Sequence, residues 1–200
     1  MAIIVIGGQS RNIGKTSVVC GLIAAMSERR WTAVKMTQCK HDTAGGELCD
    51  CELGGRSFAM DEEWDPTTGM DSSRYLTAGA VHSLWVRVRA GCLGDAMERI
   101  RAEIDSATNV ILESNSVIRY LTPDVYAVVL DSAVADFKPS ARQYLDRADA
   151  ILIPAGQEPR AHWSCASADL MQRARVFRIE PPRFCPADFV TYVTRTLDGE

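Results

Sequence analysis

The chain has 200 residues, of which 46% are hydrophobic and 24% charged, and its formal net charge is −4. This charge leaves no basic surplus for the phosphates of a nucleic acid, so the composition excludes a general nucleic-acid binder. Seven cysteines, an odd count in irregular positions, argue against a secreted disulfide framework. Residues 1–6 are too short for a signal-peptide core. No apolar run approaches the ~20 residues of a membrane span, so we expect a cytoplasmic protein without membrane contact.

Short apolar runs alternate with helical patterns along the whole chain. The alternation predicts one domain over residues 1–200, an α/β fold with a mostly parallel central sheet and helices on both faces. The expected strands, in chain order, are 2–6, 31–36, 81–88, 109–113, 125–130, 150–153 and 176–179. The expected helices are 15–29, 71–78 with Asp71 as its N-cap, 93–104, 139–147 and 186–197.

The segment between the first expected strand and the first expected helix is rich in glycine. Its pattern Gly-x5-Gly-Lys-Thr is one residue longer than the usual phosphate-binding pattern Gly-x4-Gly-Lys-Ser/Thr. Glycines let the backbone turn tightly and point N–H groups at phosphate oxygens, and the following helix adds the positive end of its dipole. The pattern predicts that a nucleoside triphosphate, GTP or ATP, binds through Gly8, Gln9, Ser10, Arg11, Asn12, Ile13, Gly14, Lys15, Thr16 and Ser17.

Side chains at the ends of expected strands can complete such a site with Mg²⁺. The Thr16 hydroxyl and the Glu113 carboxylate are suitable Mg²⁺ ligands. Lys15 can reach the β and γ phosphates, and Lys35 can contact the γ-phosphate or an acidic substrate. Carboxyl ends of parallel strands meet at one edge of a sheet, so the loops after Ile6, Lys35 and Glu113 should converge. The alternative for Lys35 and Glu113 is an ordinary surface charge at a strand end.

The later strands do not identify the base. The guanine-reading pattern Asn-Lys-x-Asp is absent after the strand at 150–153, which leaves ATP and GTP open. Asp131 and Lys138 follow the strand at 125–130 on the same expected edge. They can contact the base or a second substrate, or they can be a cap and a solvated charge.

A longer motif lies at Asp71-Ser72-Ser73-Arg74-Tyr75-Leu76-Thr77-Ala78-Gly79-Ala80. It resembles the Asp-Ser/Thr-x-Arg-x-x-x-Ala-Gly-Ala motif of the MobB family, nucleotide-binding adapters in molybdopterin guanine dinucleotide synthesis. Val34-Lys35-Met36-Thr37-Gln38 and Leu112-Glu113-Ser114 stand where that family has Val-Lys-His-Thr-His and Val-Glu-Gly, so the resemblance covers about the first three-fifths of the chain. The resemblance implies a P-loop fold, Mg²⁺-dependent GTP or ATP binding, weak hydrolysis and frequently a homodimer. It also places Asp71, with Lys15 and Lys35, among the catalytic candidates, and adds Arg74 to the site; a local interpretation makes Asp71 a cap and Arg74 a surface residue.

The longer phosphate loop is instead similar to that of dethiobiotin synthetase and its relatives. That resemblance implies an ATP-dependent kinase or ligase acting on a small carboxylate, with Lys15 and Lys35 stabilising the transferring phosphoryl group. Met36 and Gln38 in place of the two MobB histidines, and Ser114 in place of the glycine, are further departures from the MobB pattern.

A cysteine-rich loop is expected at about 38–55. Three thiols and one imidazole within it form a donor set that suits Zn²⁺, from Cys39, His41, Cys49 and Cys51. Their Cys-x-His and Cys-x-Cys spacings are tighter than usual for zinc, and a loop without metal is the alternative.

Three functions are therefore open. The first is an accessory NTPase that serves a partner enzyme, and it ranks slightly ahead because the motif at residues 71–80 is the longer one. The second is a phosphoryl-transfer enzyme with a small acidic substrate. The third is a non-catalytic nucleotide or metal sensor built on the cysteine-rich loop.

Overall fold

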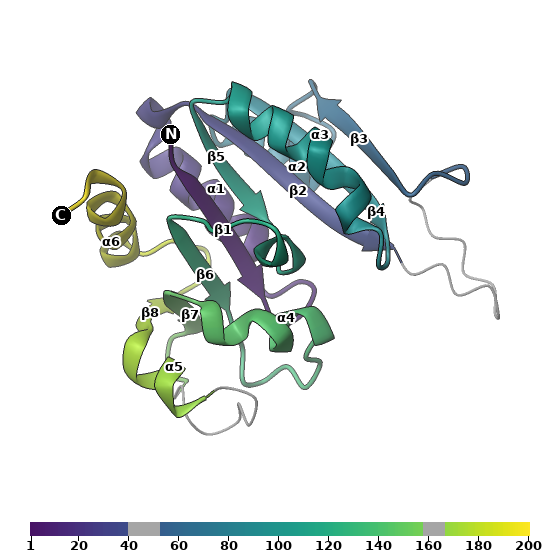
Figure 1. The fold of residues 1–200 in the computed structure, drawn as a ribbon. Helices are drawn as coiled ribbons and strands as arrows, with labels where there is room; N and C mark the ends of the chain where they lie inside the picture. The colour runs from purple at the N-terminus through teal and green to yellow at the C-terminus, as the bar shows by residue number, and fades with distance from the viewer. Residues whose placement is uncertain (40–52, 158–166) are drawn as a thin grey trace.

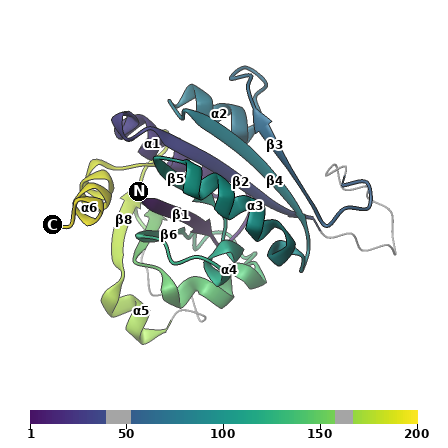
Figure 2. The same cartoon turned by 45° about the horizontal axis from the view of Figure 1, so that its top comes forward.

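The computed structural model describes residues 1–39, 53–157 and 167–200. Within these ranges one eight-stranded sheet runs in the order β3-β4-β2-β5-β1-β6-β7-β8 (Figure 1). Neighbouring strands pair in parallel, except that β3 at the edge runs antiparallel to β4. The strands are β1 Ile3–Gly8, β2 Trp31–Cys39, β3 Phe58–Glu63, β4 His82–Arg89, β5 Asn109–Glu113, β6 Val125–Val129, β7 Ala150–Pro154 and β8 Arg175–Ile179. Figures 1 and 2 both place β3 and the C-terminal helix at opposite sides of the molecule.

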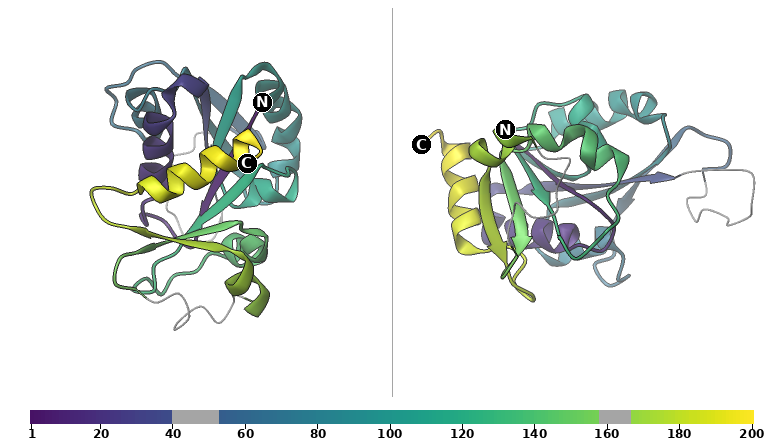
Figure 3. Two further views of the ribbon diagram at one scale, coloured as in Figure 1. Left: turned by 90° about the vertical axis from the view of Figure 1, so that its left-hand side faces the viewer. Right: turned by 90° about the horizontal axis from the view of Figure 1, so that it is seen from below.

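Helices cover both faces of the sheet, as the sequence predicts. They are α1 Lys15–Ala25, α2 Asp71–Thr77, α3 Leu93–Ser106, α4 Pro139–Tyr144, α5 Ala168–Arg173 and α6 Ala187–Asp198, with 3₁₀ turns at Ser27–Arg29, Ser116–Arg119 and Leu145–Arg147. One buried cluster joins the sheet to α3, α4 and α5, and a second joins it to α1, α2 and α6. The left view of Figure 3 shows the layers edge-on, with α1 and α3 on opposite sides of the sheet.

Strand alternation decides which face each site residue occupies. Successive side chains of a strand point to opposite faces. Ala33 of β2 and Ile111 of β5 both belong to the cluster on the α1 face. Lys35 and Glu113 follow each of them by two residues, so both point to the α1 face. Lys35 and Glu113 are also direct register partners of the parallel pair β2–β5.

The structure departs from the expected elements in several places. β2 runs to Cys39 instead of ending at residue 36, so Lys35 lies within the strand, and the expected helix at 139–147 is α4 followed by a 3₁₀ turn. The expected helix at 15–29 ends at Ala25, where the Trp31 indole donates to the Met26 carbonyl at 2.9 Å and a 3₁₀ turn follows. Strand β3 and helix α5 are not foreseen. β3 is an acidic strand at the edge of the sheet, held by its hydrogen bonds to β4 and by the Asp61–Arg87 ion pair. It lacks the apolar pattern of the central strands, which is why the sequence does not predict it. No helix in the described ranges is long and apolar enough to cross a membrane.

The prediction that Asp71 caps its helix is wrong. Met70 is the N-cap of α2 and no side chain bonds to the first-turn N–H groups. Asp71 is the first helical residue, and its carboxylate instead pairs with Lys35. The acidic side chain still lies at the positive end of the helix, where it is favourable, but its principal partner comes from the sheet.

Candidate functional site

The loop between β1 and α1 presents an open row of backbone donors. Gly14 lies in the left-handed region, with φ of 94°, and so does Asn12, with φ of 57°. In the described part of the chain, none of the backbone N–H groups of residues 10–17 has a hydrogen-bond acceptor. Consecutive N–H groups that point into a concavity at a helix N-terminus form an anion-binding nest. The geometry therefore provides the cradle that the sequence pattern predicts.

The cradle is wrapped around the stem of Lys15. A Cβ on Gly8 would lie 2.8 Å from Lys15 Cδ and 2.8 Å from Ile13 Cδ1, so position 8 has no room for a side chain. Lys15 Nζ donates to the Ser10 carbonyl at 2.5 Å, across the mouth of the loop. The lysine thus lies against the row of open donors, where an anion would contact both.

A network of ionised and hydroxyl groups adjoins the cradle, centred on Glu113, which is 4% exposed. Its Oε2 accepts from the Thr16 hydroxyl at 2.7 Å and from the Tyr75 hydroxyl at 2.5 Å. Its Oε1 pairs with Lys35 Nζ at 2.5 Å, and the same ammonium reaches Asp71 Oδ2 at 2.8 Å. Glu113 at the end of β5, Lys35 within β2 and Thr16 after the phosphate loop therefore meet. The arrowheads of β1, β2 and β5 all point to the lower right in Figure 1.

The network sets the protonation of its members. Burial alone would raise the pKa of Asp71, but the hydrogen bond and charge of Lys35, with the charge of Arg74, lower it overall. Burial, with the neighbouring Glu113 carboxylate, raises the pKa of Tyr75 well above its usual value. Asp71 is therefore ionised and Tyr75 is a fixed hydrogen-bond donor at neutral pH.

The motif at residues 71–80 lies against the phosphate loop. Arg74 of α2 donates to the Ser17 hydroxyl of α1 at 3.0 Å and lies 3.4 Å from Asp71 Oδ1. Tyr75, one residue later, carries the hydroxyl bound by Glu113. α2 thus brings Asp71, Arg74 and Tyr75 to the end of the sheet where β1 ends.

A second loop, at residues 130–138 between β6 and α4, is bonded to the phosphate loop. The Gln9 side chain donates to the Val134 carbonyl at 2.6 Å and accepts from the Asp131 N–H at 2.8 Å. The Gln9 backbone N–H and carbonyl pair with Val129 and Lys138. All polar groups of Gln9 therefore hold the two loops together, so the open donors of the cradle begin after it. Asp131 accepts from the Ala133 N–H and from the Gln157 amide in a turn. It caps no described helix, since the N-cap of α4 is Lys138.

Two residues of this network have no distinctive sequence signal. Tyr75 looks like an ordinary apolar position of a helix. Asn115 accepts from the Gly8 N–H at 2.8 Å and donates to the Gly8 carbonyl at 2.9 Å, and so fixes the start of the cradle. Spacing offers one hint for Asn115, since it follows Glu113 by two residues at the end of the same strand.

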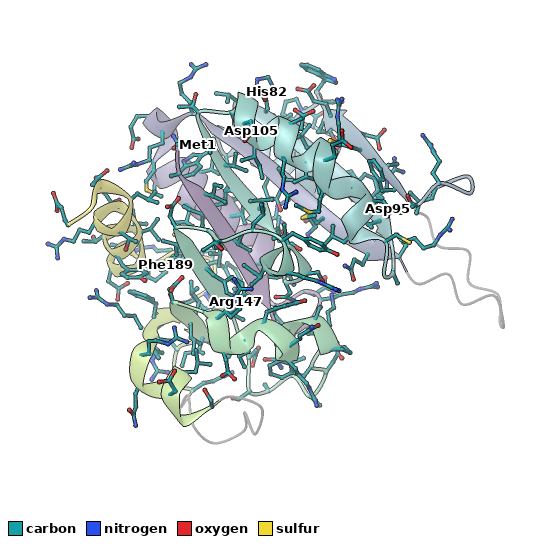
Figure 4. All side chains as sticks on the ribbon, in the orientation of Figure 1. Met1, His82, Asp95, Asp105, Arg147 and Phe189 are labelled. Atoms are coloured by element: carbon teal, nitrogen blue, oxygen red, sulfur yellow. The ribbon has the colours of Figure 1, made fainter. Side chains whose placement is uncertain are left out.

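The predicted zinc ligands are incompletely described. His41, Cys49 and Cys51 lie outside the described residues, and Cys39 is buried at the end of β2. Within the described ranges no group of three potential ligands gathers around a metal-sized space. His82 is far from the site: Figure 4 shows it with Met1 and Asp105 at the end of the sheet where β1 and β4 begin.

Comparison with known proteins supports the fold. No protein-family model and no curated protein sequence matches the chain. LpxK from Aquifex aeolicus in complex with ATP aligns with a TM-score of 0.50 and 15% identity over 89% of this chain and 53% of LpxK, so the chain spans about half of LpxK. HypB from Helicobacter pylori in complex with nickel aligns with a TM-score of 0.48 and 14% identity over 98% of this chain and 87% of HypB. The Aquifex aeolicus MinC:MinD complex aligns with a TM-score of 0.47 and 11% identity over 100% of this chain and 97% of the matched chain. The likeness to LpxK, with the parallel sheet and its loop order, shows that the chain has the P-loop NTPase fold.

Proposed function

We propose that the protein binds a nucleoside triphosphate with Mg²⁺ in the cradle between β1 and α1. The single observation that carries the proposal is the row of backbone N–H groups at residues 10–17, none of which has an acceptor in the described chain. Consecutive unpaired N–H groups at a helix N-terminus favour an anion, and a phosphate chain offers several acceptors to them at once. Lys15 supplies the compensating charge.

The donor set beside the cradle fits Mg²⁺. Thr16 and Glu113 offer hard oxygen ligands, and the bond they share at 2.7 Å would be exchanged for coordination. Mg²⁺ held by these two residues would supply positive charge to offset that of the phosphates. Lys35 is placed to stabilise charge on the terminal phosphate. Asp71 can orient a water molecule or an acceptor beside the terminal phosphate. Its lowered pKa makes it a weak base, so we expect hydrolysis to be slow.

Calorimetric titration of the wild-type protein with ATP and GTP, in Mg²⁺ and in EDTA, tests the proposal. We expect saturable binding of at least one nucleotide, strengthened by Mg²⁺. Absence of heat and of any thermal stabilisation with both nucleotides would contradict the assignment.

The nucleotide affinity should fall above pH 8. Burial, helped by the charges of Lys138 and Lys35 and opposed by those of Glu113 and Asp71, lowers the pKa of Lys15 to about 8. Only the ammonium form attracts phosphate, so affinity is complete below pH 8 and declines as pH rises through it, by up to about tenfold per unit. Calorimetry between pH 7 and 9.5 measures the decline. A Lys15→Arg variant keeps its charge throughout, so its profile should be flat; a flat wild-type profile would refute the prediction.

Of the finer functions, we favour the accessory NTPase of the MobB type; the sensor alternative depends on the cysteine-rich loop, most of which lies outside the described residues. The accessory role is supported by the placement of Asp71 and Arg74 against the phosphate loop. In this role the protein works as a homodimer and assists a partner enzyme, and the nucleotide that it holds controls that assistance. The alternative, phosphoryl transfer to a small carboxylate, is favoured by the long phosphate loop and by Lys35.

Phosphate release separates these two functions. We expect slow release from the protein alone, changed little by a panel of small mono- and dicarboxylates, because an accessory NTPase has no small acceptor. Initial rates are measured with ATP and GTP in Mg²⁺, with Lys15→Ala as the background. Strong stimulation by any one carboxylate would overturn the accessory function in favour of the kinase or ligase.

A further inference from the structure

Lys138 is a cation beside the cradle that the proposed function does not use. It precedes α4 and is half-buried. Its ammonium makes no ion pair and no side-chain hydrogen bond in the described part of the chain, although Lys35, its counterpart across the site, has two carboxylate partners. Its charge is therefore not neutralised within the described chain and is available to an anionic ligand.

The loop that carries Lys138 is held rigidly to the phosphate loop. Its backbone N–H donates to the Gln9 carbonyl at 2.8 Å. The Gln9 side chain makes two further bonds to the same loop, and Asp136 accepts from the Ser10 hydroxyl at 2.7 Å. The backbone of Lys138 is thus held beside the phosphate loop, so binding there does not have to order this segment first.

The charges around Lys138 leave a positive surplus. Burial, followed by the proximity of Arg11, lowers the pKa of Lys138, while Asp136 and Glu113 oppose the shift. Lys138 in turn lowers the pKa of Lys15. Of the nearby carboxylates, Glu113 is bound by Lys35, and Asp136 accepts from Ser10. Lys15 donates only to a carbonyl. Lys138, Arg11 and Lys15 therefore lie close enough to act on one another's charge, and the nearby carboxylates already have other partners.

We propose that Lys138, with Arg11 beside it, forms a second oxyanion subsite next to the phosphate cradle. The subsite takes either the terminal phosphate of the bound nucleotide or the acidic group of a second substrate. It rests on the proposed nucleotide function. It extends that function by adding a substrate-contacting residue from outside the phosphate loop.

The test removes the Lys138 charge and keeps the aliphatic stem, in Lys138→Met. The matched control is Arg142→Met, which removes an exposed positive charge one turn further along. Calorimetry measures the binding of Mg-ATP and of Mg-ADP to the free protein. It then measures the binding of orthophosphate to the protein saturated with Mg-ADP. For a terminal-phosphate contact we expect Mg-ATP to weaken by about tenfold or more while Mg-ADP is unchanged. For a second-substrate contact, both nucleotides bind normally and orthophosphate affinity falls by a similar factor.

Two outcomes would overturn the subsite. An equal loss of affinity for Mg-ATP and Mg-ADP would mean that Lys138 acts only through its long-range charge or through the conformation of its loop. No change in any of the three ligands, or an equal change in Arg142→Met, would mean that it touches no anion. Lys138→Arg should retain wild-type affinities, and Lys138→Gln provides a second neutral variant should the methionine perturb folding. If the wild type itself binds no nucleotide, the proposed function fails, but orthophosphate binding to the free protein still tests the subsite.

Discussion

Lys15→Ala is expected to reduce nucleotide affinity by at least about 100-fold. The Lys15 ammonium lies against the open donors of the cradle, and charge-assisted hydrogen bonds contribute about 1.5–3 kcal/mol each. Two such contacts to phosphates correspond to this loss. Calorimetry with Mg-ATP and Mg-GTP measures it. Unchanged affinity would mean that the phosphates bind elsewhere.

The same variant should fold normally, which separates the loss of binding from unfolding. Lys15 is desolvated in the free protein and its ammonium bonds only to the Ser10 carbonyl. Removing a charge that burial disfavours should leave the melting temperature unchanged or slightly higher. Arg99→Ala, on the exposed face of α3, is the control and should bind nucleotide like the wild type.

Glu113→Ala is expected to destabilise the protein by about 2–4 kcal/mol. The carboxylate is buried and accepts from Thr16, Tyr75 and Lys35. Its removal leaves two hydroxyls and part of a charge unsatisfied, and breaking a buried pair from one side typically costs about 3–5 kcal/mol. Asp71 still balances Lys35, which places the expected value below the top of that range. Urea denaturation at neutral pH measures the change.

Glu113→Gln should separate stability from metal binding. The amide keeps the size of the side chain and one acceptor oxygen, so it should destabilise less than alanine. It is a poorer Mg²⁺ ligand, so the gain in nucleotide affinity that Mg²⁺ provides should shrink. Glu98→Ala, an exposed carboxylate on α3, is the control. If Glu113→Ala melts like Glu98→Ala, the network around Glu113 contributes nothing to stability.

The sequence predicted the parts of this protein that depend on local pattern. The alternation of apolar strands and amphipathic helices gave the parallel sheet, because each element must bury one face or both. Gly8, Gly14, Lys15 and Thr16 form a contiguous pattern whose geometry is determined within a few residues. The end of β5 at Glu113 was also clear, since a carboxylate ends an apolar run there.

The tertiary structure decided which side chains meet at the edge of the sheet. Tyr75, Gln9 and Asn115 acquire their roles through partners 38 to 122 positions away in the chain, and no local pattern encodes such pairings. Asp71 looked like a helix cap because caps and charge partners use the same residue types. Only the packing of α2 against β2 brought it near enough to Lys35 to form the ion pair. β3 is a strand because its backbone can pair with the otherwise unpaired edge of β4. The sequence alone thus determined the cradle, whereas packing determined the charged network around it, because hydrogen bonds and ion pairs depend on distances in space.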